Sequence, residues 1–320
     1  MKLFSDQCLS GQLVNQQPSL ASKLNSWLWP QLDTALGTEL FGTDADQAIE
    51  FVGSGALGYD TMRSSGDRKQ LVIFGTGLSS APALPAVPLS WDIRCVRGPL
   101  SAGRLGLPVG KAITDAGLLV SLVFEASSER EGCSFIPQMQ HASEAGESWQ
   151  RICEQSGIRY IDPRWPIEQV LRAIASSERV LAESVTGAIM AEALRIPWIP
   201  IASSPRVCAF EWQDWCTSLN VFYHPYRLPA LKSYRPWALG FQANMHALKH
   251  WFGAVLEGPV STSQYELLAA ECVLAQRLAN IAKQAPSLSR EAVFVEKVDA
   301  LQTSFSYLCQ QYAQDAIACL

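Results

Sequence analysis

The 320-residue chain lacks several features that would place it in common protein classes. It has no run of 18 or more apolar residues, so the sequence predicts no membrane-spanning helix. Its first ten residues lack the apolar core of a secretory signal peptide. Its nine cysteines are scattered from Cys8 to Cys319 without a CxxC pair, which favours reduced thiols over a disulfide framework or a zinc site. These absences predict a cytoplasmic protein without a metal.

Clustered positive charge is also missing. The net charge is −5 and the isoelectric point is near 5.5, which argues against a nucleic-acid partner. Hydrophobic residues make up 48% of the chain and charged residues 17%, which is typical of a globular protein. A chain of this length has room for two domains, each with its own core.

The segment 179–202, RVLAESVTGAIMAEALRIPWIPIA, is the most informative stretch. Val180 to Ala182 predict a strand, Glu183 to Gly187 a turn, and Ala188 to Leu194 a helix. Pro197 ends that helix and Trp198 to Ile201 begin the next strand. In a parallel sheet the loop after a strand faces the ligand crevice, and a helix N-terminus there attracts anions. Chemistry is therefore expected at residues 183–187.

The first half of the chain predicts a short aromatic helix and four strands. The helix is 24–32, and the strands are 49–53, 70–75, 93–96 and 112–115. A further helix begins at Pro99 and runs through Leu105. Gly53, Gly55 and Gly58 match GxGxxG by spelling, but a lone match is weak and a plain tight turn is favoured. No cofactor is therefore predicted.

The second half alternates strands and helices more regularly. The expected strands are 133–137 and 158–161, and the expected helices are 143–155, 166–175 and 210–219. Such alternation is typical of a doubly wound parallel sheet. Two long helices, 264–285 and 290–320, follow. The polar segment 125–132 is the expected seam, which gives an N-terminal domain 1–125, a second domain 126–225, and a helical extension 226–320 that packs on the domains or mediates self-association.

Several segments resemble the polysaccharide pyruvyl transferases. The most specific segment is WDIRCVRGPLSA at 91–102. The others, in chain order, are LNSWLWP at 24–30, AITD at 112–115, GIRYIDPR at 157–164, the segment 179–202 and EWQDWCTSL at 211–219. The resemblance implies an α/β fold with two Rossmann-like doubly wound domains in a GT-B-like arrangement and an active site between them. It also implies transfer of a pyruvyl group from phosphoenolpyruvate to a saccharide, lipid-linked or not, in exopolysaccharide biosynthesis at the inner face of the membrane.

This sequence departs from the family pattern near the N-terminus, where Ser22 and Lys23 replace a Gly-Asp pair, and at three donor-binding or acid/base positions. Relatives typically have histidine where Thr186 and Gln138 stand, and lysine where Glu211 stands. Since the donor carries a phosphate and a carboxylate, these changes remove groups that would bind anions or move protons. His141 follows Gln138 by three residues and is the candidate replacement.

Candidate roles follow from these positions. The candidate catalytic residues are Glu183, Thr186 and His141. The candidate donor-binding residues are Arg94, Arg97, Ser184, Gly187 and Arg206. The candidate acceptor-binding residues are Asn25, Gly53, Ser54 and Asp115.

Structural alternatives remain open for most of these residues. Arg94 and Arg97 would instead form an inter-domain salt bridge with Asp92 or Asp115. Asp115 would cap a helix, and Thr186 would be the N-cap of its helix or lie near it. Glu183 would act as a general base if burial raised its pKa. His246 and His250 share a helix face, but no third ligand supports a zinc site. Three functions stay open: a pyruvyl transferase, a glycosyltransferase that uses a nucleotide-activated sugar, and a non-catalytic assembly partner.

Overall fold

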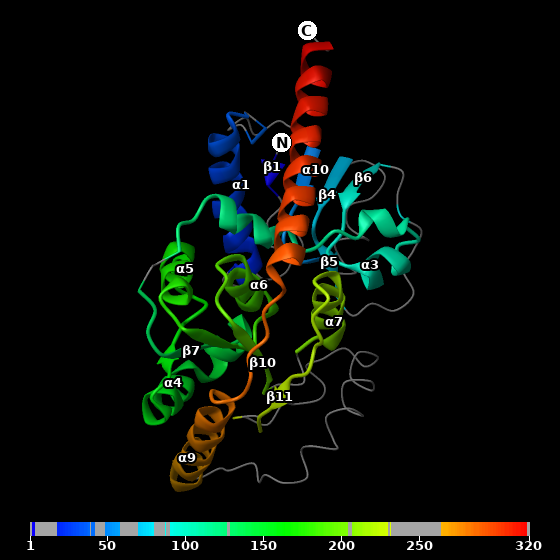
Figure 1. The fold of residues 1–320 in the computed structure, drawn as a ribbon. Coiled ribbons are helices and arrows are strands. Elements are labelled where there is room, and N and C mark those ends of the chain that lie inside the picture. The colour runs from blue at the N-terminus through cyan, green and yellow to red at the C-terminus, as the bar shows by residue number, and fades with distance from the viewer. Residues whose placement is uncertain are drawn as a thin grey trace. The chain divides into compact units, whose positions relative to one another are not determined.

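A computed structural model describes residues 2–3, 18–38, 40–41, 49–57, 70–79, 87, 90–126, 129–203, 207–229, 231 and 264–318 (Figure 1). The chain forms two compact units. Unit 1 contains Met1–Glu125, Ala209–Phe222 and Ser289–Leu320, and unit 2 contains Ala126–Cys208 and Tyr223–Leu288. Both are built on parallel strands, so the chain is an α/β protein. None of the described helices is long and apolar enough to cross a bilayer.

Unit 1 holds a four-stranded parallel sheet in the order β1-β2-β4-β6. The strands are Lys2–Leu3, Ile49–Val52, Gln70–Phe74 and Trp91–Cys95. A small parallel pair, β3 (Ala56–Leu57) and β5 (Gly77–Leu78), follows β2 and β4. The predicted strand 112–115 is wrong: only Ala112 forms a bridge, to Val96, and Asp115 instead caps a short 3-10 helix, η3 (Ala116–Leu122).

An aromatic core joins the helices of unit 1 to its sheet. Trp29 lies on α1 (Leu20–Leu36), which contains the predicted helix 24–32. Its ring lies 4.7 Å from Phe51 of β2 and 5.7 Å from Phe74 of β4 between centroids. Phe305, on the long helix α10 (Glu291–Ala318), lies 5.5 Å from the same indole. Because α10 fills this core, it is a part of unit 1 and not a detached extension.

Two further helices complete unit 1: α3 (Pro99–Arg104) and α7 (Ala209–Ser218). Pro99 stands at the first position of α3, as predicted. The 3-10 turn η2 (Val109–Lys111) links α3 to the bridge at Ala112.

Unit 2 holds a five-stranded parallel sheet in the order β11-β10-β9-β7-β8. The strands are Cys133–Ile136 (β7), Arg159–Tyr160 (β8), Arg179–Ala182 (β9), Trp198–Ala202 (β10) and Tyr226–Arg227 (β11). The chain moves from β7 outward to β8 and then returns past β7 to β9. The strand order therefore reverses between β7 and β9, and such a switch point opens a crevice at the carboxyl ends of the strands.

Helices cover both faces of this sheet. On one face α4 (Met139–Ser156) and α9 (Gln264–Ile281) share a core with Phe135, Leu181 and Ile199. On the other, α5 (Ile167–Ala175) packs with α6 (Val185–Ala193), which contacts β9 and β10. The periodicity of α5 is confirmed, since Val170, Leu171 and Ile174 are buried.

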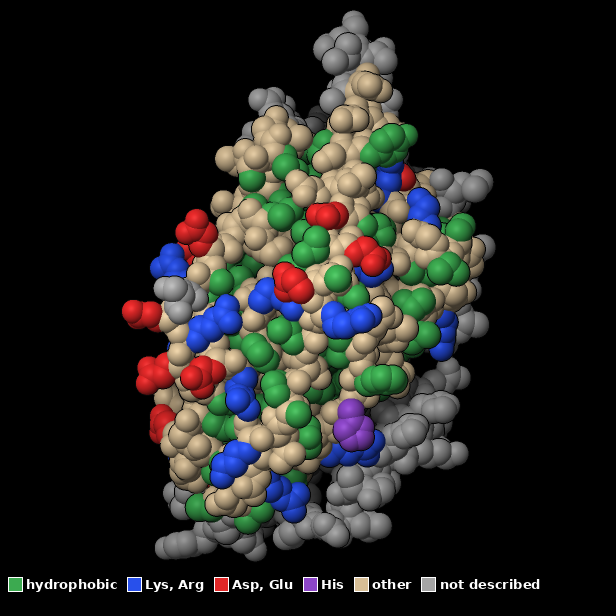
Figure 2. Space-filling model, in the orientation of Figure 1, with side chains coloured by type: hydrophobic (Ala, Val, Ile, Leu, Met, Phe, Trp, Pro, Cys, Tyr) green, Lys and Arg blue, Asp and Glu red, His purple; other side chains and the backbone are tan. Residues whose placement is uncertain are grey.

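The predicted extension 226–320 does not group as one body. Its first long helix, α9, lies in unit 2 and its second, α10, lies in unit 1. The chain leaves Glu125 for unit 2 inside the predicted polar seam 125–132. Acidic and basic side chains are interspersed on the face shown in Figure 2, in keeping with the modest net charge.

Candidate functional site

Three strand ends of unit 2 bring polar side chains together at the switch point. Glu183 follows β9 directly, Ser203 follows β10, and His141 lies in the first turn of α4, which follows β7. All three side chains are buried. Since β7, β9 and β10 are consecutive in the sheet, their carboxyl ends deliver these groups to one place.

Glu183 is the centre of this cluster. Its carboxylate accepts hydrogen bonds from the backbone N–H of Gln138 at 3.0 Å and from Nδ1 of His141 at 3.0 Å. Ser203 donates its hydroxyl to the Oε1 atom of the same carboxylate. Burial alone would raise the pKa of Glu183, but the attraction to His141 and these hydrogen bonds outweigh it, so the pKa is lowered. Glu183 therefore stays ionised inside the protein.

The ionised carboxylate fixes the state of the His141 ring. A carboxylate only accepts hydrogen bonds, so Nδ1 must carry a proton. The ring also lies edge-on against Trp149, with centroids 5.2 Å apart and an interplanar angle of 85°. Nε2 is thus the ring nitrogen that is bonded to neither Glu183 nor Ser203.

Ser203 does not have the geometry of an activated nucleophile. Its hydroxyl bonds to Glu183 and lies 3.3 Å from Nδ1 of His141, on the same side of the ring as the carboxylate. In a nucleophile–base–acid triad the hydroxyl and the carboxylate contact opposite nitrogens of the imidazole. The cluster is therefore a His–Glu pair with a supporting hydroxyl.

The N-terminus of α6 lies directly beside Glu183. Its N-cap is Ser184, whose hydroxyl accepts the N–H of Gly187 at 3.3 Å. Thr186 was predicted to be the N-cap or to lie near it, and it lies two positions after the cap, inside the first turn. A Cβ on Gly187 would approach the Ile136 side chain to 2.8 Å, so this glycine lets α6 pack closely on β7.

The four residues predicted to bind the acceptor lie in unit 1, and three of them, Asn25, Ser54 and Asp115, are linked by hydrogen bonds. Asn25 donates to the carbonyl oxygen of Ser54 at 2.8 Å and accepts the Trp29 indole N–H at 2.9 Å. The hydroxyl of Ser54 donates to Asp115 at 2.6 Å. A Cβ on Gly53 would lie 2.4 Å from the Trp29 indole nitrogen. The buried set therefore joins α1 to the loops after the strands, and we do not assign it to the acceptor.

Asp115 caps η3 as the alternative role predicted. Its carboxylate accepts the N–H of Gly117 at 2.9 Å and is fully buried. Burial raises the pKa of Asp115, and the attraction to Arg97 and the hydrogen bond from Ser54 only partly offset that rise.

Arg97 is also held inside unit 1. Its guanidinium donates to the carbonyl oxygens of Gly55 at 3.0 Å and Leu78 at 2.9 Å, and its Nε lies 3.6 Å from Oδ2 of Asp214. Its side chain has no solvent exposure. The expected contact between Arg97 and a donor anion is thus replaced by contacts with this chain.

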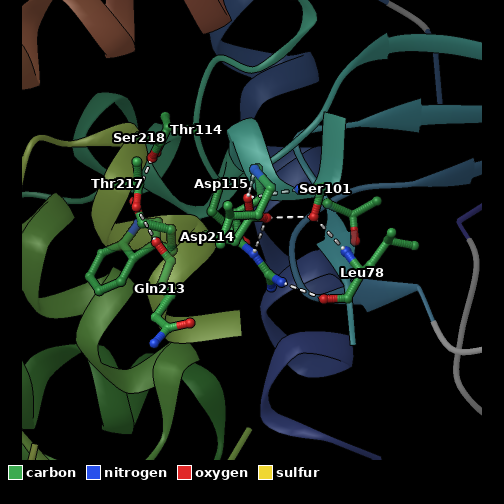
Figure 3. A network of polar contacts seen from close by, with 12 residues as sticks. Leu78, Ser101, Thr114, Asp115, Gln213, Asp214, Thr217 and Ser218 are labelled. Atoms are coloured by element: carbon green, nitrogen blue, oxygen red, sulfur yellow. Dashed lines mark hydrogen bonds and ion pairs between the residues drawn. The ribbon is translucent and has the colours of Figure 1, made fainter. Parts of the chain in front are cut away.

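The start of α3 is likewise occupied. Oδ1 of Asp214, from α7, accepts the N–H groups of Leu100 at 2.8 Å and Ser101 at 3.0 Å. Figure 3 shows Ser101 between Asp214 and Leu78, with its hydroxyl contacting both. Sequence reasoning missed Asp214, because the position predicts only an acidic residue on a helix.

Arg94 faces a different part of unit 1. Its Nε donates a hydrogen bond to the Asp92 carboxylate at 2.8 Å, and its Nη2 donates one to the side-chain oxygen of Gln311 on α10 at 2.9 Å. The predicted structural alternative named Asp92 as a partner but placed the salt bridge between domains, whereas both residues lie on β6 of unit 1. Arg94 and Arg97 therefore do not form one anion site in unit 1.

The remaining candidates lie elsewhere. Arg206, His246 and His250 are outside the described residues. Within the described ranges, no group of three His, Cys, Asp or Glu side chains is placed to hold a metal ion. Of the predicted site residues, the structure thus unites His141, Glu183, Ser184, Thr186 and Gly187 in unit 2.

The fold and this cluster define an α/β protein with a buried His–Glu pair at the switch point of a parallel sheet. No profile of a known protein family matches the chain. The chain is 30% identical over 319 residues to the succinoglycan biosynthesis protein ExoV of Rhizobium meliloti (strain 1021), which covers 93% of this chain and 98% of that protein. The chain belongs to the family of that succinoglycan biosynthesis protein.

Proposed function

We propose that this protein is a polysaccharide pyruvyl transferase that moves the pyruvyl group of phosphoenolpyruvate onto a saccharide in exopolysaccharide biosynthesis. Three findings support the proposal: the ordered resemblance between residues 24 and 219, the relationship to a succinoglycan biosynthesis protein, and the His141–Glu183 pair. The pair carries most weight, because the reaction needs one group that both gives and takes protons. We further propose that the two units are the two lobes of a GT-B-like enzyme and that the acceptor is lipid-linked.

In the proposed reaction His141 is the acid and then the base. With both ring nitrogens protonated, Nε2 gives its proton to the terminal carbon of the enol. A sugar hydroxyl bonds to the neighbouring carbon, and its proton passes to the imidazole. The bond between that carbon and the phosphate oxygen then breaks, and a second hydroxyl takes its place, giving the ketal and inorganic phosphate. Each proton taken from a hydroxyl balances one delivered to carbon or to phosphate.

Glu183 is a positioning residue in this proposal. Its lowered pKa keeps it ionised, so it does not meet the condition of a raised pKa that a general base would require. The negative charge at Nδ1 instead stabilises the protonated imidazole and holds the ring. This also explains how the chain functions with Gln138 in place of a histidine: the Gln138 N–H supports Glu183, while His141 supplies the imidazole.

The donor phosphate is proposed to bind at the first turn of α6, residues 184–187. Backbone N–H groups at a helix start suit a phosphate, and this turn adjoins Glu183 and His141. Arg206, which follows β10, stays a predicted phosphate ligand.

The first test replaces His141 and Glu183 by glutamine. Phosphate release from phosphoenolpyruvate with a panel of oligosaccharides should fall about 10²- to 10⁴-fold in His141→Gln, because proton transfer is lost. The rate of phosphate release should also fall in Glu183→Gln, because a neutral amide does not stabilise the charged ring as a carboxylate does. The exposed His224→Gln is the matched control and should keep the parent rate. Mass spectrometry of the acceptor identifies the ketal.

Ligand binding tests the donor separately. Phosphoenolpyruvate should raise the melting temperature by mass action. A rise with nucleotide sugars alone would contradict the proposal in favour of a glycosyltransferase. No rise with either ligand would favour a non-catalytic assembly partner.

A further inference from the structure

Tyr160 and Arg164 lie at the carboxyl end of β8, the strand next to β7, and have no role in the function proposed above. Tyr160 is paired with Phe135 of β7 in the sheet register. Its phenolic oxygen is buried and has no hydrogen-bond partner among the described residues. A buried hydroxyl without a partner is costly, so a ligand that accepted its hydrogen bond would be stabilised at this edge.

The Arg164 guanidinium approaches the same place. A Cβ added to Gly146 of α4 would lie 3.0 Å from Nη2 of Arg164 and 3.6 Å from the Tyr160 oxygen. The two side chains thus converge over a stretch of helix backbone that carries no side chain. A larger residue at Gly146 would press on the guanidinium and fill this space.

Helix α4 is irregular at this point. Ala145, with φ −144° and ψ 25°, interrupts the helix between His141 and Gly146. The first turn, which carries His141, is therefore set apart from the turn that carries Gly146. Five residues of helix correspond to about 7 to 8 Å along the axis, which is the scale of one small molecule.

Asp162 orients Arg164. Its carboxylate accepts hydrogen bonds from Nε of Arg164 at 2.8 Å and from the backbone N–H of the same residue at 2.9 Å. The Arg164 side chain is still 36% exposed. The ion pair with Asp162 holds the guanidinium in one orientation at the carboxyl end of the sheet. The negative charge of Asp162 also partly neutralises the positive charge of Arg164.

The strand order places these groups opposite the start of α6. Along the sheet the sequence of strands is β9, β7, β8, so α6 follows one neighbour of β7 and Arg164 follows the other. His141 follows β7 itself. The start of α6 and Arg164 therefore follow the two strands that lie on either side of β7.

We propose that Tyr160 and Arg164 form a subsite for the carboxylate of the donor, on the opposite side of His141 from the phosphate. The inference rests on the proposed function, since phosphoenolpyruvate carries both groups on the carbon that the acceptor attacks. Tyr160 donates one hydrogen bond and Arg164 gives a charged one. Burial, with a smaller contribution from Asp162 and Glu183, raises the pKa of Tyr160, so its hydroxyl stays a donor.

Binding measurements on the full-length chain test this subsite. Calorimetry with phosphoenolpyruvate, oxalate and inorganic phosphate is run on the parent, Arg164→Gln and Tyr160→Phe. Arg164→Gln should weaken the binding of phosphoenolpyruvate and of oxalate about tenfold or more. Tyr160→Phe should weaken the binding of both ligands about two- to tenfold. Inorganic phosphate should bind all three proteins equally, because it has no carboxylate. Arg172→Gln, whose side chain is 74% exposed in the same unit, is the control.

Asp162→Asn separates a ligand contact from a loop tether. It breaks the same ion pair as Arg164→Gln but leaves the guanidinium in place, so it should keep oxalate binding. Equal losses in Asp162→Asn and Arg164→Gln would overturn the subsite, as would unchanged oxalate binding in Arg164→Gln and Tyr160→Phe. If oxalate binds through Arg164 while phosphoenolpyruvate does not bind the parent, the subsite stands and the proposed function fails.

Discussion

Ser203 shows how one hydroxyl sets the chemistry of the His–Glu pair. It is fully buried and donates to Glu183, and this hydrogen bond is one of the causes that lower the pKa of that carboxyl. The folded-state pKa of Glu183 lies below its unfolded value. Its ionised form therefore stabilises the fold above the unfolded pKa, and this contribution is lost as the pH falls through the folded value.

Ser203→Ala should raise the pKa of Glu183. The loss of activity and the loss of folded structure at acid pH should therefore both occur at a higher pH. The acid limb of the phosphate-release profile should shift upward, and acid unfolding, followed by circular dichroism, should begin at a higher pH than in the parent. Ser134→Ala is the matched control: Ser134 is equally buried on β7 and bonds to Ser177 instead of the pair. An identical shift in both variants would mean that only general stability has changed.

At this scale the sequence predicted His141 and Glu183 as separate candidates but not as partners. They are 42 residues apart, and their contact depends on β7 and β9 being neighbours. Ser203 gave no signal of its own, because a serine after a strand is common in loops. Arg97 was predicted correctly as a cation at a strand end, but its partner Asp214 lies 117 positions later on another helix.

Among the elements, α7 and α3 are joined by the Asp214 carboxylate and by Arg104 of α3, which lies over the Phe210 ring of α7 at 5.1 Å. Gly98, the N-cap of α3, has no side chain, and Asp214 supplies the capping acceptor from the neighbouring helix. A Cβ on Gly98 would lie 2.1 Å from the Asp214 backbone oxygen, so only glycine permits this approach. The same carboxylate is the counter-charge of the buried Arg97.

Asp214→Asn should destabilise unit 1 by about 3–5 kcal/mol, because a buried arginine would lose its ion-pair partner. Its amide oxygen would still accept the Leu100 and Ser101 N–H groups, so the loss comes mainly from the charge. The double variant with Arg97→Met should recover part of the stability, since it removes the unpaired cation. Urea unfolding measures both, and simple addition of the two single effects would contradict the coupling.

The elements themselves were largely predictable from local patterns. The apolar run of β4 and the spacing of buried residues in α5 carry their own signal, and so does the strand–turn–helix of residues 179–202. The strand predicted at 112–115 was wrong because Ile113 and Thr114 favour strands, whereas Asp115 is the N-cap of η3. Short strands such as β11 depend on their neighbour and give almost no pattern.

For the whole molecule, the main lesson is that unit 1 is assembled from three separate segments of the chain. The N-terminal 125 residues are joined by α7 and, from the far end of the chain, by α10. Hydrophobic periodicity cannot reveal this, because it predicts that α10 is a helix and not which core it enters. The deciding residue is Phe305, which meets Trp29 and Phe74.

Phe305→Ala should therefore weaken strands more than 200 residues away. Removing a fully buried phenylalanine costs about 3–5 kcal/mol, and a compact unit loses protection as a whole. Hydrogen exchange should speed up in β2 and β4 of unit 1, while β7 and β9 of unit 2 keep their protection. Val295→Ala, at a site on α10 that is 44% exposed, should leave both units unchanged. If exchange rises only within α10, or equally in both units, then α10 is not an integral part of the unit 1 core.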